Sequence, residues 1–322
     1  MKKKIIIVTG DPNSINSELI FKSWRKIDNN LKKRILIISN YNLLKSQFKK
    51  LGYKCKLEKI KDFKDFNYSS NMKIIDVRLT FKKPFNVSFY QASNYVIKSL
   101  NLAHKLGLRP DVNGIVNCAI NKKLLKKSKI GVTEYLASKC NIRDRSEVML
   151  IKNKKFAVCP VTTHIDLKEV PKTIEKKNII INKVKQINQW YIKNYKKKPK
   201  IGILGLNPHN AEFRLNSHEE KVIKPAINRL KKIKIFVNGP LVTDTVFIKQ
   251  YKEFDIIVGM YHDQVLTHFK TLFGFDAINI TLGLKYLRVS PDHGVGSDII
   301  GKNKANPISL IKCLDYIKKF EK

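Results

Sequence analysis

Short apolar runs rich in isoleucine and valine recur along the chain, and most are bounded by Gly, Pro, Asn, Asp or Lys. The runs cover residues 5–9, 35–39, 74–77, 114–120, 156–161, 201–206, 235–237 and 255–260. Strands that are buried on both faces have this character. Segments with helical spacing of apolar residues, such as 90–106 and 219–233, lie between several of the runs. Strands that alternate with helices predict an α/β fold with a largely parallel sheet.

Length and composition limit the class of protein. The chain has 322 residues, of which 43% are hydrophobic and 28% are charged, so disorder, collagen and disulfide scaffolds are excluded. A chain of this length buries about 75% of the surface of its unfolded form, and we expect two domains. No stretch approaches the roughly 18 apolar residues that span a bilayer, and the N-terminal apolar run is too short for a signal peptide. The five cysteines form no C-x-x-C pair, as expected of reduced thiols in a cytoplasmic protein.

The net charge of +38 ordinarily indicates a nucleic-acid partner. However, nine of the 64 basic residues are arginines and 55 are lysines, and the lysines are spread along the whole chain. Nucleic-acid readers favour arginine, because its planar guanidinium pairs with bases and phosphates through two hydrogen bonds. We therefore interpret most lysines as solvated side chains and expect neither a specific nucleic acid nor a membrane as partner.

Three histidines directly follow apolar runs. His164, His209 and His262 lie after the runs that end at residues 161, 206 and 260, and they are separated by 45 and 53 residues. Each separation is long enough for the chain to form a helix and return to the sheet. Ligands of open α/β sheets collect at the carboxyl ends of strands, and three neutral imidazoles with an open position typically bind a catalytic metal, most often Zn²⁺. The alternative for each histidine is a loop residue that only makes hydrogen bonds.

Further polar residues lie near the C-terminus. Asp263 follows His262 and is a candidate to orient a ligand or to accept a proton, and Lys270 lies a few residues downstream. Asn279 and Arg288 lie at the two ends of a segment whose polar residues suit an anionic ligand. The sequence contains neither G-x-G-x-x-G after a strand, nor a Walker A motif, nor G-x-S-x-G. A Rossmann site, a P-loop and a nucleophile elbow are therefore not indicated.

An ordered set of motifs over most of the chain resembles the 4-hydroxythreonine-4-phosphate dehydrogenase family of pyridoxal phosphate biosynthesis. The motifs are VTGDPNSINSELI, NCAINKK, GVTEYLA, VTTHIDLKEVP, GLNPHNAE, GPLVTDTVF, MYHDQVLTHFK, INITLGLKYLRVSPDHG and DIIGKNKANP. That family is similar in fold to isocitrate and isopropylmalate dehydrogenases, which bind NAD without a Rossmann fingerprint. The resemblance implies a two-domain α/β/α fold with its active site in the interdomain cleft. It also implies an outer domain of residues 1–125 and 275–322 and a central metal-binding and dimerisation domain of residues 126–274.

The resemblance also implies the residues of the site. The metal ligands would be the three histidines His164, His209 and His262, and they would bind Zn²⁺ or, alternatively, Mg²⁺, Mn²⁺ or Co²⁺. Matching family positions assign the small phosphorylated substrate to Thr133, Lys270, Asn279 and Arg288, and place the acidic residues Asp244 and Asp263 near the metal. The cofactor, NAD or NADP, would contact His293, Gly294 and Asn306, for which the alternative is a tight turn that leads into a C-terminal helix. In the family, the metal ligands come from both subunits of a homodimer.

The implied reaction is the oxidation and decarboxylation of 4-phosphooxy-L-threonine to 3-amino-2-oxopropyl phosphate. A metal that binds the substrate hydroxyl lowers its pKa, a base removes the proton, and hydride leaves the same carbon for the nicotinamide. The resulting 3-oxo acid loses CO₂ because the metal stabilises the enolate. Asp263 and Lys270 are the candidates for proton transfer, and Asp244 is a further candidate catalytic residue. Arg288 and Lys270 would bind phosphate or carboxylate.

Two departures from the family pattern bear on the substrate. Val132 replaces a histidine that usually contacts the substrate, and valine forms no side-chain hydrogen bonds. Ser14 and Asn16 replace two glycines of the N-terminal loop. A paralogous dehydrogenase of a four-carbon sugar acid phosphate, such as threonate or erythronate 4-phosphate, is one alternative. A catalytically degenerate polyanion-binding protein is another.

Overall fold

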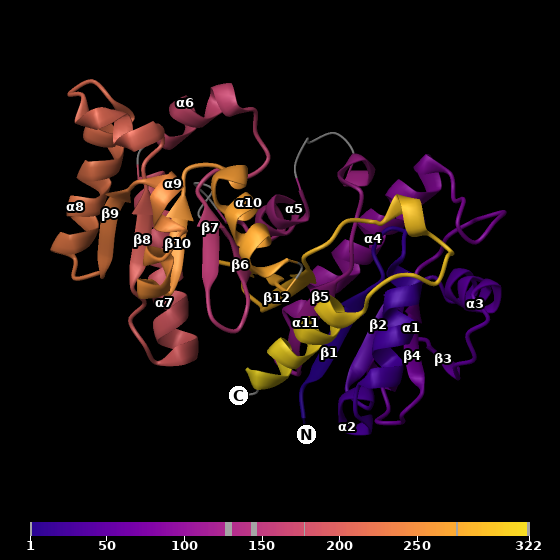
Figure 1. The fold of residues 1–322 in the computed structure, drawn as a ribbon. Coiled ribbons are helices and arrows are strands. Elements are labelled where there is room, and N and C mark those ends of the chain that lie inside the picture. The colour runs from indigo at the N-terminus through magenta and orange to yellow at the C-terminus, as the bar shows by residue number, and fades with distance from the viewer. Residues whose placement is uncertain (1, 126–130, 143–146, 177, 275, 321–322) are drawn as a thin grey trace. The chain divides into compact units, whose positions relative to one another are not determined.

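The chain divides into two compact units. The computed structural model describes residues 2–125, 131–142, 147–176, 178–274 and 276–320 (Figure 1). Unit 1 comprises Met1–Lys139 and Lys285–Lys322, and unit 2 comprises Cys140–Leu284. The expected boundaries, after residues 125 and 274, lie earlier in the chain than the observed ones. The expected two-domain α/β fold with a largely parallel sheet is confirmed.

The described part of unit 1 contains a sheet of six parallel strands. In spatial order these are β3 (Leu57–Ile60), β4 (Met72–Asp76), β2 (Ile35–Ser39), β1 (Lys4–Val8), β5 (Val112–Asn117) and β12 (Arg288–Pro291). In β1, residues 5–8 pair with β2 on one side and β5 on the other, and their exposed fractions are 0–2%. Burial on both faces explains why this strand is a continuous apolar run.

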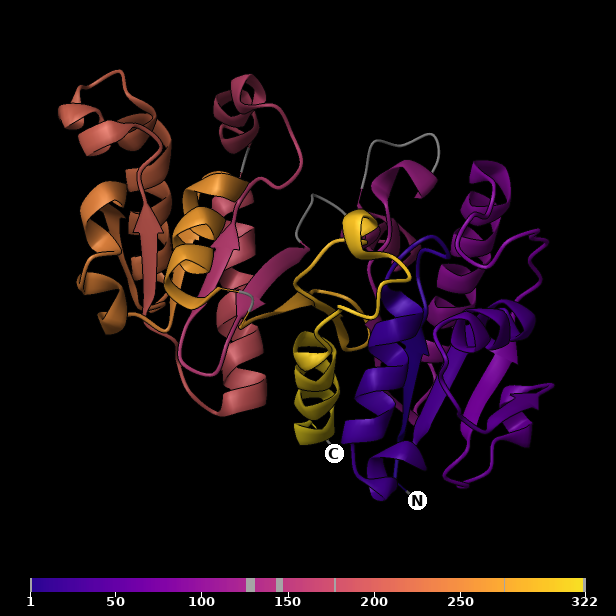
Figure 2. The same cartoon turned by 45° about the vertical axis from the view of Figure 1, so that its right-hand side comes forward.

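Helices cover both faces of this sheet. They are α1 (Asn16–Lys26), α2 (Asn29–Lys32), α3 (Tyr41–Lys50), α4 (Phe89–Gly107), α5 (Val132–Lys139) and α11 (Ile308–Lys319), with short helices η1 (Phe63–Asp65), η2 (Lys122–Leu125) and η7 (Ser297–Ile299). The chain leaves β1 through α1 toward β2, whereas it leaves β4 through α4 in the opposite direction, toward β5. Right-handed crossovers therefore place α1 and α4 on opposite faces. Helices α1 and α11 lie side by side (Figures 1 and 2). The carboxyl ends of β1 and β5 form a topological switch point.

The sheet of unit 2 is mixed. Its described strands, in spatial order, are β11 (Ile278–Leu282), β6 (Val148–Lys152), β7 (Ala157–Pro160), β10 (Ile256–Gly259), β8 (Ile201–Leu204) and β9 (Val237–Leu241). Strands β11, β6 and β7 pair in antiparallel fashion. Strands β7, β10, β8 and β9 are parallel, so their carboxyl ends meet at one edge.

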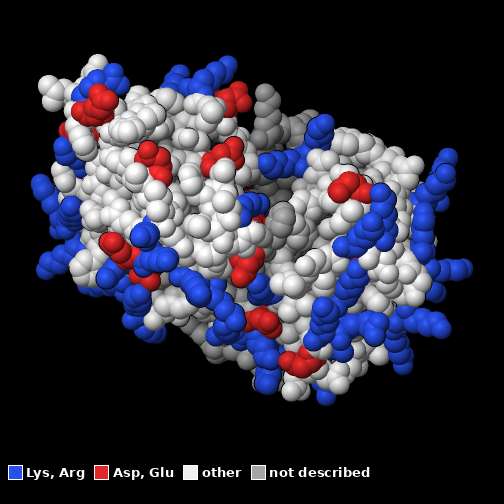
Figure 3. All heavy atoms as spheres, viewed as in Figure 1, with Lys and Arg blue, Asp and Glu red and all other residues white. Residues whose placement is uncertain are grey.

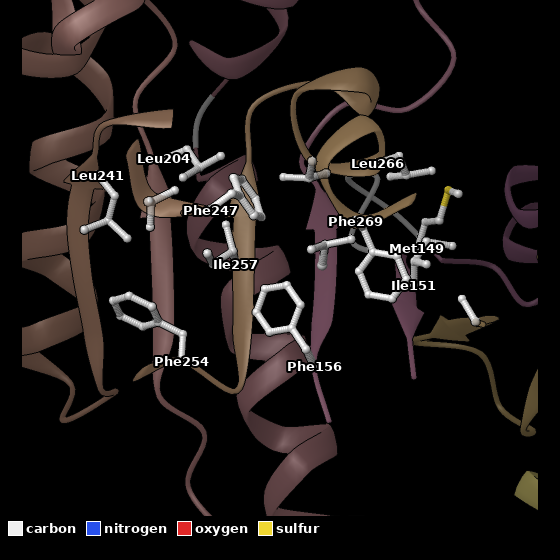
Figure 4. Close-up of a cluster of buried hydrophobic side chains, with 14 residues drawn as sticks. Met149, Ile151, Phe156, Leu204, Leu241, Phe247, Phe254, Ile257, Leu266 and Phe269 are labelled. Atoms are coloured by element: carbon white, nitrogen blue, oxygen red, sulfur yellow. The ribbon is translucent and has the colours of Figure 1, made fainter. Parts of the chain in front are cut away.

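The helices of unit 2 connect the strands of this sheet. They are α6 (Val170–Ile174), α7 (Ile179–Tyr195), α8 (Lys224–Lys232), α9 (Thr243–Val246) and α10 (His262–Phe273), with short segments η3 (Leu167–Glu169), η4 (Pro208–Phe213), η5 (Glu219–Ile223) and η6 (Gln250–Glu253). Helix α10 inserts Val265, Leu266 and Phe269 into a cluster with Phe156 and Ile257 (Figure 4). Each such side chain contributes about 1.5–3 kcal/mol when it is fully buried. This packing holds the first turn of α10 at the carboxyl edge of the sheet.

Among the described residues, no helix is both long enough and apolar enough to cross a bilayer.

Candidate functional site

The candidate metal-binding residues follow the four parallel strands of unit 2. His164 lies in the loop after β7, and His262 is the first residue of α10, after β10. His209 lies in η4, after β8, and Asp244 lies in α9, after β9. These strands are neighbours in the order β7-β10-β8-β9. Because adjacent strands lie about 4.7–4.9 Å apart, the four residues occupy successive positions along one sheet edge.

His164 and His262 are close together. Their ring centroids are 5.7 Å apart, and the ring planes are inclined by 40°. The Nδ1 atom of His262 lies 2.8 Å from Oδ1 of Asp263, so this ring can donate to the carboxylate and present Nε2 to a ligand. The Asp263 carboxylate is therefore placed to set the tautomer of His262.

His209 lies beside Asp244. Residues 209–213 all have positive φ, between 48° and 56°, so η4 contains a left-handed turn. The His209 Nε2 atom is 3.9 Å from Oδ2 of Asp244, and both side chains are largely exposed. The structure thus brings His164 and His262 together and places His209 with Asp244 over the neighbouring strands.

The close pair of imidazoles fits a divalent ion. Two imidazoles that bind one Zn²⁺ at Zn–N distances of about 2.0–2.1 Å have ring centroids roughly 5–6 Å apart. Imidazole nitrogen and carboxylate oxygen are ligand types that suit Zn²⁺ and, with more oxygen ligands, Mg²⁺ or Mn²⁺. Within the described part of the chain, no three His, Cys, Asp or Glu residues lie close enough together to enclose an ion. If an ion is bound here, His209, Asp244 or a ligand from outside the chain would complete its ligand set.

Two predicted substrate residues belong to unit 2. Lys270 is half-buried on α10, the helix that begins with His262. Asn279 lies on β11, and its Oδ1 atom is buried without a hydrogen bond from the described residues. A buried acceptor of this kind is unusual in proteins and is available to a polar ligand.

Two further predicted substrate residues, Arg288 and Thr133, are bonded to each other in unit 1. The Arg288 side chain, on β12, has an exposed fraction of 3%. Its Nε donates to Oδ1 of Asn117 at 2.5 Å and its Nη1 donates to Oγ1 of Thr133 at 3.2 Å. Burial lowers the pKa of Arg288 to about 10, against the attraction of Glu134. The guanidinium is therefore charged near neutral pH.

The proposed cofactor segment makes local contacts. His293 donates from Nδ1 to the carbonyl oxygen of Gly294 at 2.9 Å, and Asn306 Oδ1 accepts from the backbone N–H of Ile308 at 3.0 Å, at the start of α11. These are the contacts of a turn that leads into a helix. A role for the segment in NAD binding stays a prediction.

The N-terminal loop lies at the switch point of unit 1. Gly10 has a φ of +74°, and a Cβ there would lie 2.5 Å from the carbonyl oxygen of Ala119. Neither Ser14 nor Asn16 has a positive φ. The Ser14 hydroxyl donates to the carbonyl oxygen of Asp11 at 2.5 Å, and Asn16 Nδ2 donates to two backbone carbonyls at 2.8 Å. Side-chain hydrogen bonds thus hold a loop for which the family pattern uses glycine.

Sequence reasoning assigned no role to Asn117 or Gln264. Asn117 accepts from Arg288, and Gln264 hydrogen-bonds three loops at the carboxyl edge of unit 2. Asn117 lies in the motif NCAINKK and Gln264 lies in MYHDQ. Membership of these motifs was the one indication in the sequence that the two residues belong to the site. Their partners are distant in the chain, so spacing did not reveal them.

A cavity of about 790 Å³ lies in unit 1, away from all of these residues. Its lining consists of Tyr41, Lys45, Phe48, Lys49, Gly52, Tyr53, Lys54, Cys55, Lys56 and Leu57. None of the predicted site residues contributes to it.

Basic side chains are widely distributed. On the face seen in Figure 3, lysine and arginine are spread over both units rather than gathered in one patch. This distribution agrees with the interpretation of the lysines as solvated side chains.

The fold and these residues define the class of protein as a two-unit α/β protein in which His164, His209, His262 and Asp244 follow the carboxyl ends of parallel strands. The chain belongs to the family of the pyridoxal phosphate biosynthetic protein PdxA, whose family model matches residues 31–317. It is therefore a dehydrogenase, an oxidoreductase of pyridoxine biosynthesis. The resemblance inferred from the motifs is confirmed.

Relatives match over nearly the whole chain. A 4-hydroxythreonine-4-phosphate dehydrogenase of Sulfurihydrogenibium sp. is 36% identical over 97% of this chain and 96% of its own. A protein of Oceanobacillus iheyensis that is provisionally named a D-threonate 4-phosphate dehydrogenase is 33% identical over 97% and 96%. The crystal structure of a 4-hydroxythreonine-4-phosphate dehydrogenase from Burkholderia phymatum is 28% identical, with a TM-score of 0.79 over 100% of this chain and 99% of that one.

Proposed function

We propose that the protein is a divalent-metal-dependent dehydrogenase that uses NAD or NADP to oxidise and decarboxylate 4-phosphooxy-L-threonine. The observation that carries this proposal is the pair of imidazoles of His164 and His262, whose ring centroids are 5.7 Å apart at the carboxyl edge of unit 2. His209 and Asp244 follow the next two strands of the same edge. Relatives named as 4-hydroxythreonine-4-phosphate dehydrogenases support the choice of substrate.

The chain's own residues would prepare the substrate. When bound, a divalent ion acts as a Lewis acid on the substrate oxygen, and the nicotinamide accepts hydride. The side chains of His164, His209 and His262 would hold that ion, and Asp263 would keep His262 in the ligating tautomer. Asn279 Oδ1 would accept a hydrogen bond from a substrate donor, and Asp263 or Lys270 would move the hydroxyl proton.

Unit 1 would contribute to anion binding. Arg288 is charged, buried and held by Asn117 and Thr133. Charge-assisted hydrogen bonds from guanidinium to phosphate or carboxylate are about twice as strong as neutral ones. We therefore assign Arg288 and Thr133 to the binding of the substrate's anionic group.

Formation of NADH from 4-phosphooxy-L-threonine tests the proposal. We expect activity that is abolished by chelation, restored by added metal, and lost in His209→Ala. The matched control is His218→Ala, which removes an imidazole of unit 2 that pairs with Glu175 at 2.9 Å and leaves activity intact. Turnover that persists in metal-free protein or in His209→Ala would remove the metal role.

A second candidate substrate is a four-carbon sugar acid phosphate. Val132, the first residue of α5, lies next to Thr133 and replaces the family histidine. The Oceanobacillus iheyensis relative has a name that refers to D-threonate 4-phosphate. Comparing kcat/KM for 4-phosphooxy-L-threonine, threonate 4-phosphate and erythronate 4-phosphate decides between the candidates.

We also propose that the enzyme is a homodimer with shared sites. In one chain, two of the three predicted imidazole ligands lie close together, and His209 lies apart with Asp244. A partner subunit that supplies ligands would complete the set.

A further inference from the structure

One buried amide connects three loops at the carboxyl edge of unit 2. The Gln264 side chain, in the first turn of α10, has an exposed fraction of 4%. Its Oε1 accepts from the backbone N–H of Met260 at 2.6 Å, and its Nε2 donates to the carbonyl oxygen of Gly205 at 2.7 Å and to Oγ1 of Thr243 at 3.0 Å. The amide is thus bonded to segments that follow β10, β8 and β9.

These three loops carry candidate metal-binding residues. Met260 lies two residues before His262, Gly205 lies four residues before His209, and Thr243 immediately precedes Asp244. Gln264 is therefore hydrogen-bonded to each of the three segments. Its own side chain is buried, so we do not count it among the candidate metal ligands.

The hydrogen-bond chain extends to the fourth loop. The carbonyl oxygen of Met260 accepts from the backbone N–H of Thr162 at 3.1 Å and from its Oγ1 at 2.7 Å. Thr162 lies two residues before His164. A continuous path therefore runs from the loop after β7, through Met260 and Gln264, to the loops after β8 and β9.

The partners require an amide at this position. The N–H of Met260 needs an acceptor, whereas the carbonyl oxygen of Gly205 needs a donor, and the amide of Gln264 supplies both, which an ionised carboxylate of the same length does not. The same partners fix which amide atom is oxygen and which is nitrogen. Gly259 leaves room for the side chain, because a Cβ there would lie 2.9 Å from Gln264 Oε1 and 2.5 Å from Cγ1 of Val265.

We infer that Gln264 is a positioning residue that holds the loops bearing His164, His209, His262 and Asp244 in the arrangement that binds a divalent ion. The inference rests on the proposed metal-dependent function. Residues that orient metal ligands through hydrogen bonds typically change metal affinity by about 10–100-fold when they are replaced.

Binding of Co²⁺ to metal-free, full-length protein tests the inference. The dissociation constant is measured by calorimetric titration, and the visible absorption of bound Co²⁺ reports its coordination. We expect Gln264→Leu to weaken Co²⁺ binding by about 10–100-fold and to alter the absorption. Gln264→Glu keeps an acceptor for Met260 but loses both donated hydrogen bonds, so it should also weaken binding.

Gln47→Leu is the matched control. Gln47 is a buried amide of unit 1 whose Nε2 donates to the carbonyl oxygens of Pro12 at 2.8 Å and Pro84 at 2.6 Å. Its replacement removes hydrogen bonds of the same kind and should lower the melting temperature, while Co²⁺ affinity and absorption stay those of the unaltered protein. A general loss of stability is thereby separated from a loss of positioning.

The outcomes distinguish the two proposals. If both Gln264 variants fail to fold, Thr243→Val takes their place. This substitution removes the hydroxyl that accepts a hydrogen bond from Gln264, and it should also weaken Co²⁺ binding. If the folded Gln264 variants bind Co²⁺ with normal affinity while His262→Ala abolishes binding, the positioning role of Gln264 is overturned. The metal-dependent function would stand in that case. Absence of Co²⁺ binding by the unaltered protein would overturn the metal-dependent function and the positioning role together.

Discussion

Arg288 shows how a single residue of a polar segment becomes a binding group. Sequence analysis placed it at the end of a segment suited to anions, and the structure buries it between Asn117 and Thr133. Burial lowers the pKa of Arg288 to about 10, which is still well above 7, so the charge persists at neutral pH. The hydrogen bond to Asn117, 171 residues away in the chain, has no signature in sequence spacing.

Replacement of Arg288 should reduce substrate affinity. We expect Arg288→Met to lower kcat/KM for the phosphorylated substrate by about 30-fold or more, because loss of one partner of a buried charge pair costs roughly 2–5 kcal/mol. Arg288→Lys should recover only part of the loss, since an ammonium lacks the planar fork. Steady-state kinetics, with the exposed Arg229→Met as control, measure the effect. Unchanged KM in a folded Arg288→Met protein would contradict the assignment.

Lys73 provides a residue-level prediction about stability. The residue is 0% exposed on β4, its Nζ donates to the carbonyl oxygen of Ser69 at 2.5 Å, and the Phe66 ring centroid is 5.1 Å away. Burial lowers the pKa of Lys73 to about 8, against the attraction of Glu58. The unfolded protein therefore binds more protons than the folded one between pH 8 and about 10.5. The stability cost is complete below pH 8 and disappears as the pH rises through this window.

Urea unfolding of the unaltered protein and of Lys73→Met at several pH values tests whether this stability rises with pH. The free energy of unfolding of the unaltered protein, relative to the variant, should rise by about 1–3 kcal/mol from pH 7.5 to pH 10.5. Parallel pH profiles of the two proteins would show that Lys73 is not titrating as inferred.

At the scale of elements, the apolar runs predicted strands well where both faces are buried. Each of the eight runs overlaps an observed strand, and α4 confirms the expected helix at 90–106. Strand β9 begins at the end of its run and continues through Asn-Gly-Pro, residues that are depleted in strands. Strands β3, β6, β11 and β12 were not expected; β11 and β12 include polar residues and had been interpreted as a ligand-binding segment.

The residues of the candidate site could be predicted from the sequence, but their order along the edge of the sheet could not. The sequence places a histidine after each of three apolar runs, but it does not show that β10 lies between β7 and β8. That order brings His262 next to His164 and places His209 on the other side of β10. The left-handed turn of η4 and the hydrogen bonds of Gln264 depend on contacts between distant segments, so no local pattern indicates them.

The short helix η5 holds the loop that leads to His209. Glu219, buried at the start of η5, accepts from the backbone N–H of Leu206 at 2.8 Å and of Asn207 at 2.7 Å. Burial raises the pKa of Glu219, but the hydrogen bonds from Asn207 and Leu206 outweigh it and the net pKa is lowered. The carboxylate therefore stabilises the folded state above its unfolded pKa, and this stability is lost as the pH falls through the folded pKa.

Glu219→Gln should destabilise the protein in a pH-dependent way. At pH 7 we expect a loss of about 1.5–3 kcal/mol in the free energy of unfolding, the usual contribution of hydrogen bonds to a charged group. The difference from the unaltered protein should shrink as the pH falls below about 4. Denaturant unfolding at pH 3.5, 5 and 7 measures it, and a pH-independent difference would contradict a role for the charge.

At the scale of the whole molecule, the net charge of +38 is carried by dispersed lysines. Such a surface holds polyanions by counterion release, and this binding weakens steeply with salt. Loss of DNA binding near physiological salt, together with normal dehydrogenase activity, would exclude polyanion binding as the main function.

Subunit mixing tests the proposed shared site. Two inactive variants, His209→Ala and His262→Ala, are mixed and allowed to exchange subunits. If the two ligands of one site come from different subunits, each heterodimer has one intact site and the mixture recovers about a quarter of full activity. No recovery in a mixture that contains heterodimers would place His209 and His262 of each site on the same subunit.

The most direct test of the account is a crystal structure of the Zn²⁺-loaded protein, with diffraction recorded at the zinc absorption edge. We predict one anomalous peak per site at the carboxyl edge of unit 2, about 2.0–2.1 Å from imidazole nitrogens of His164, His209 and His262. A peak elsewhere, or imidazoles that remain without a metal at saturating Zn²⁺, would contradict it.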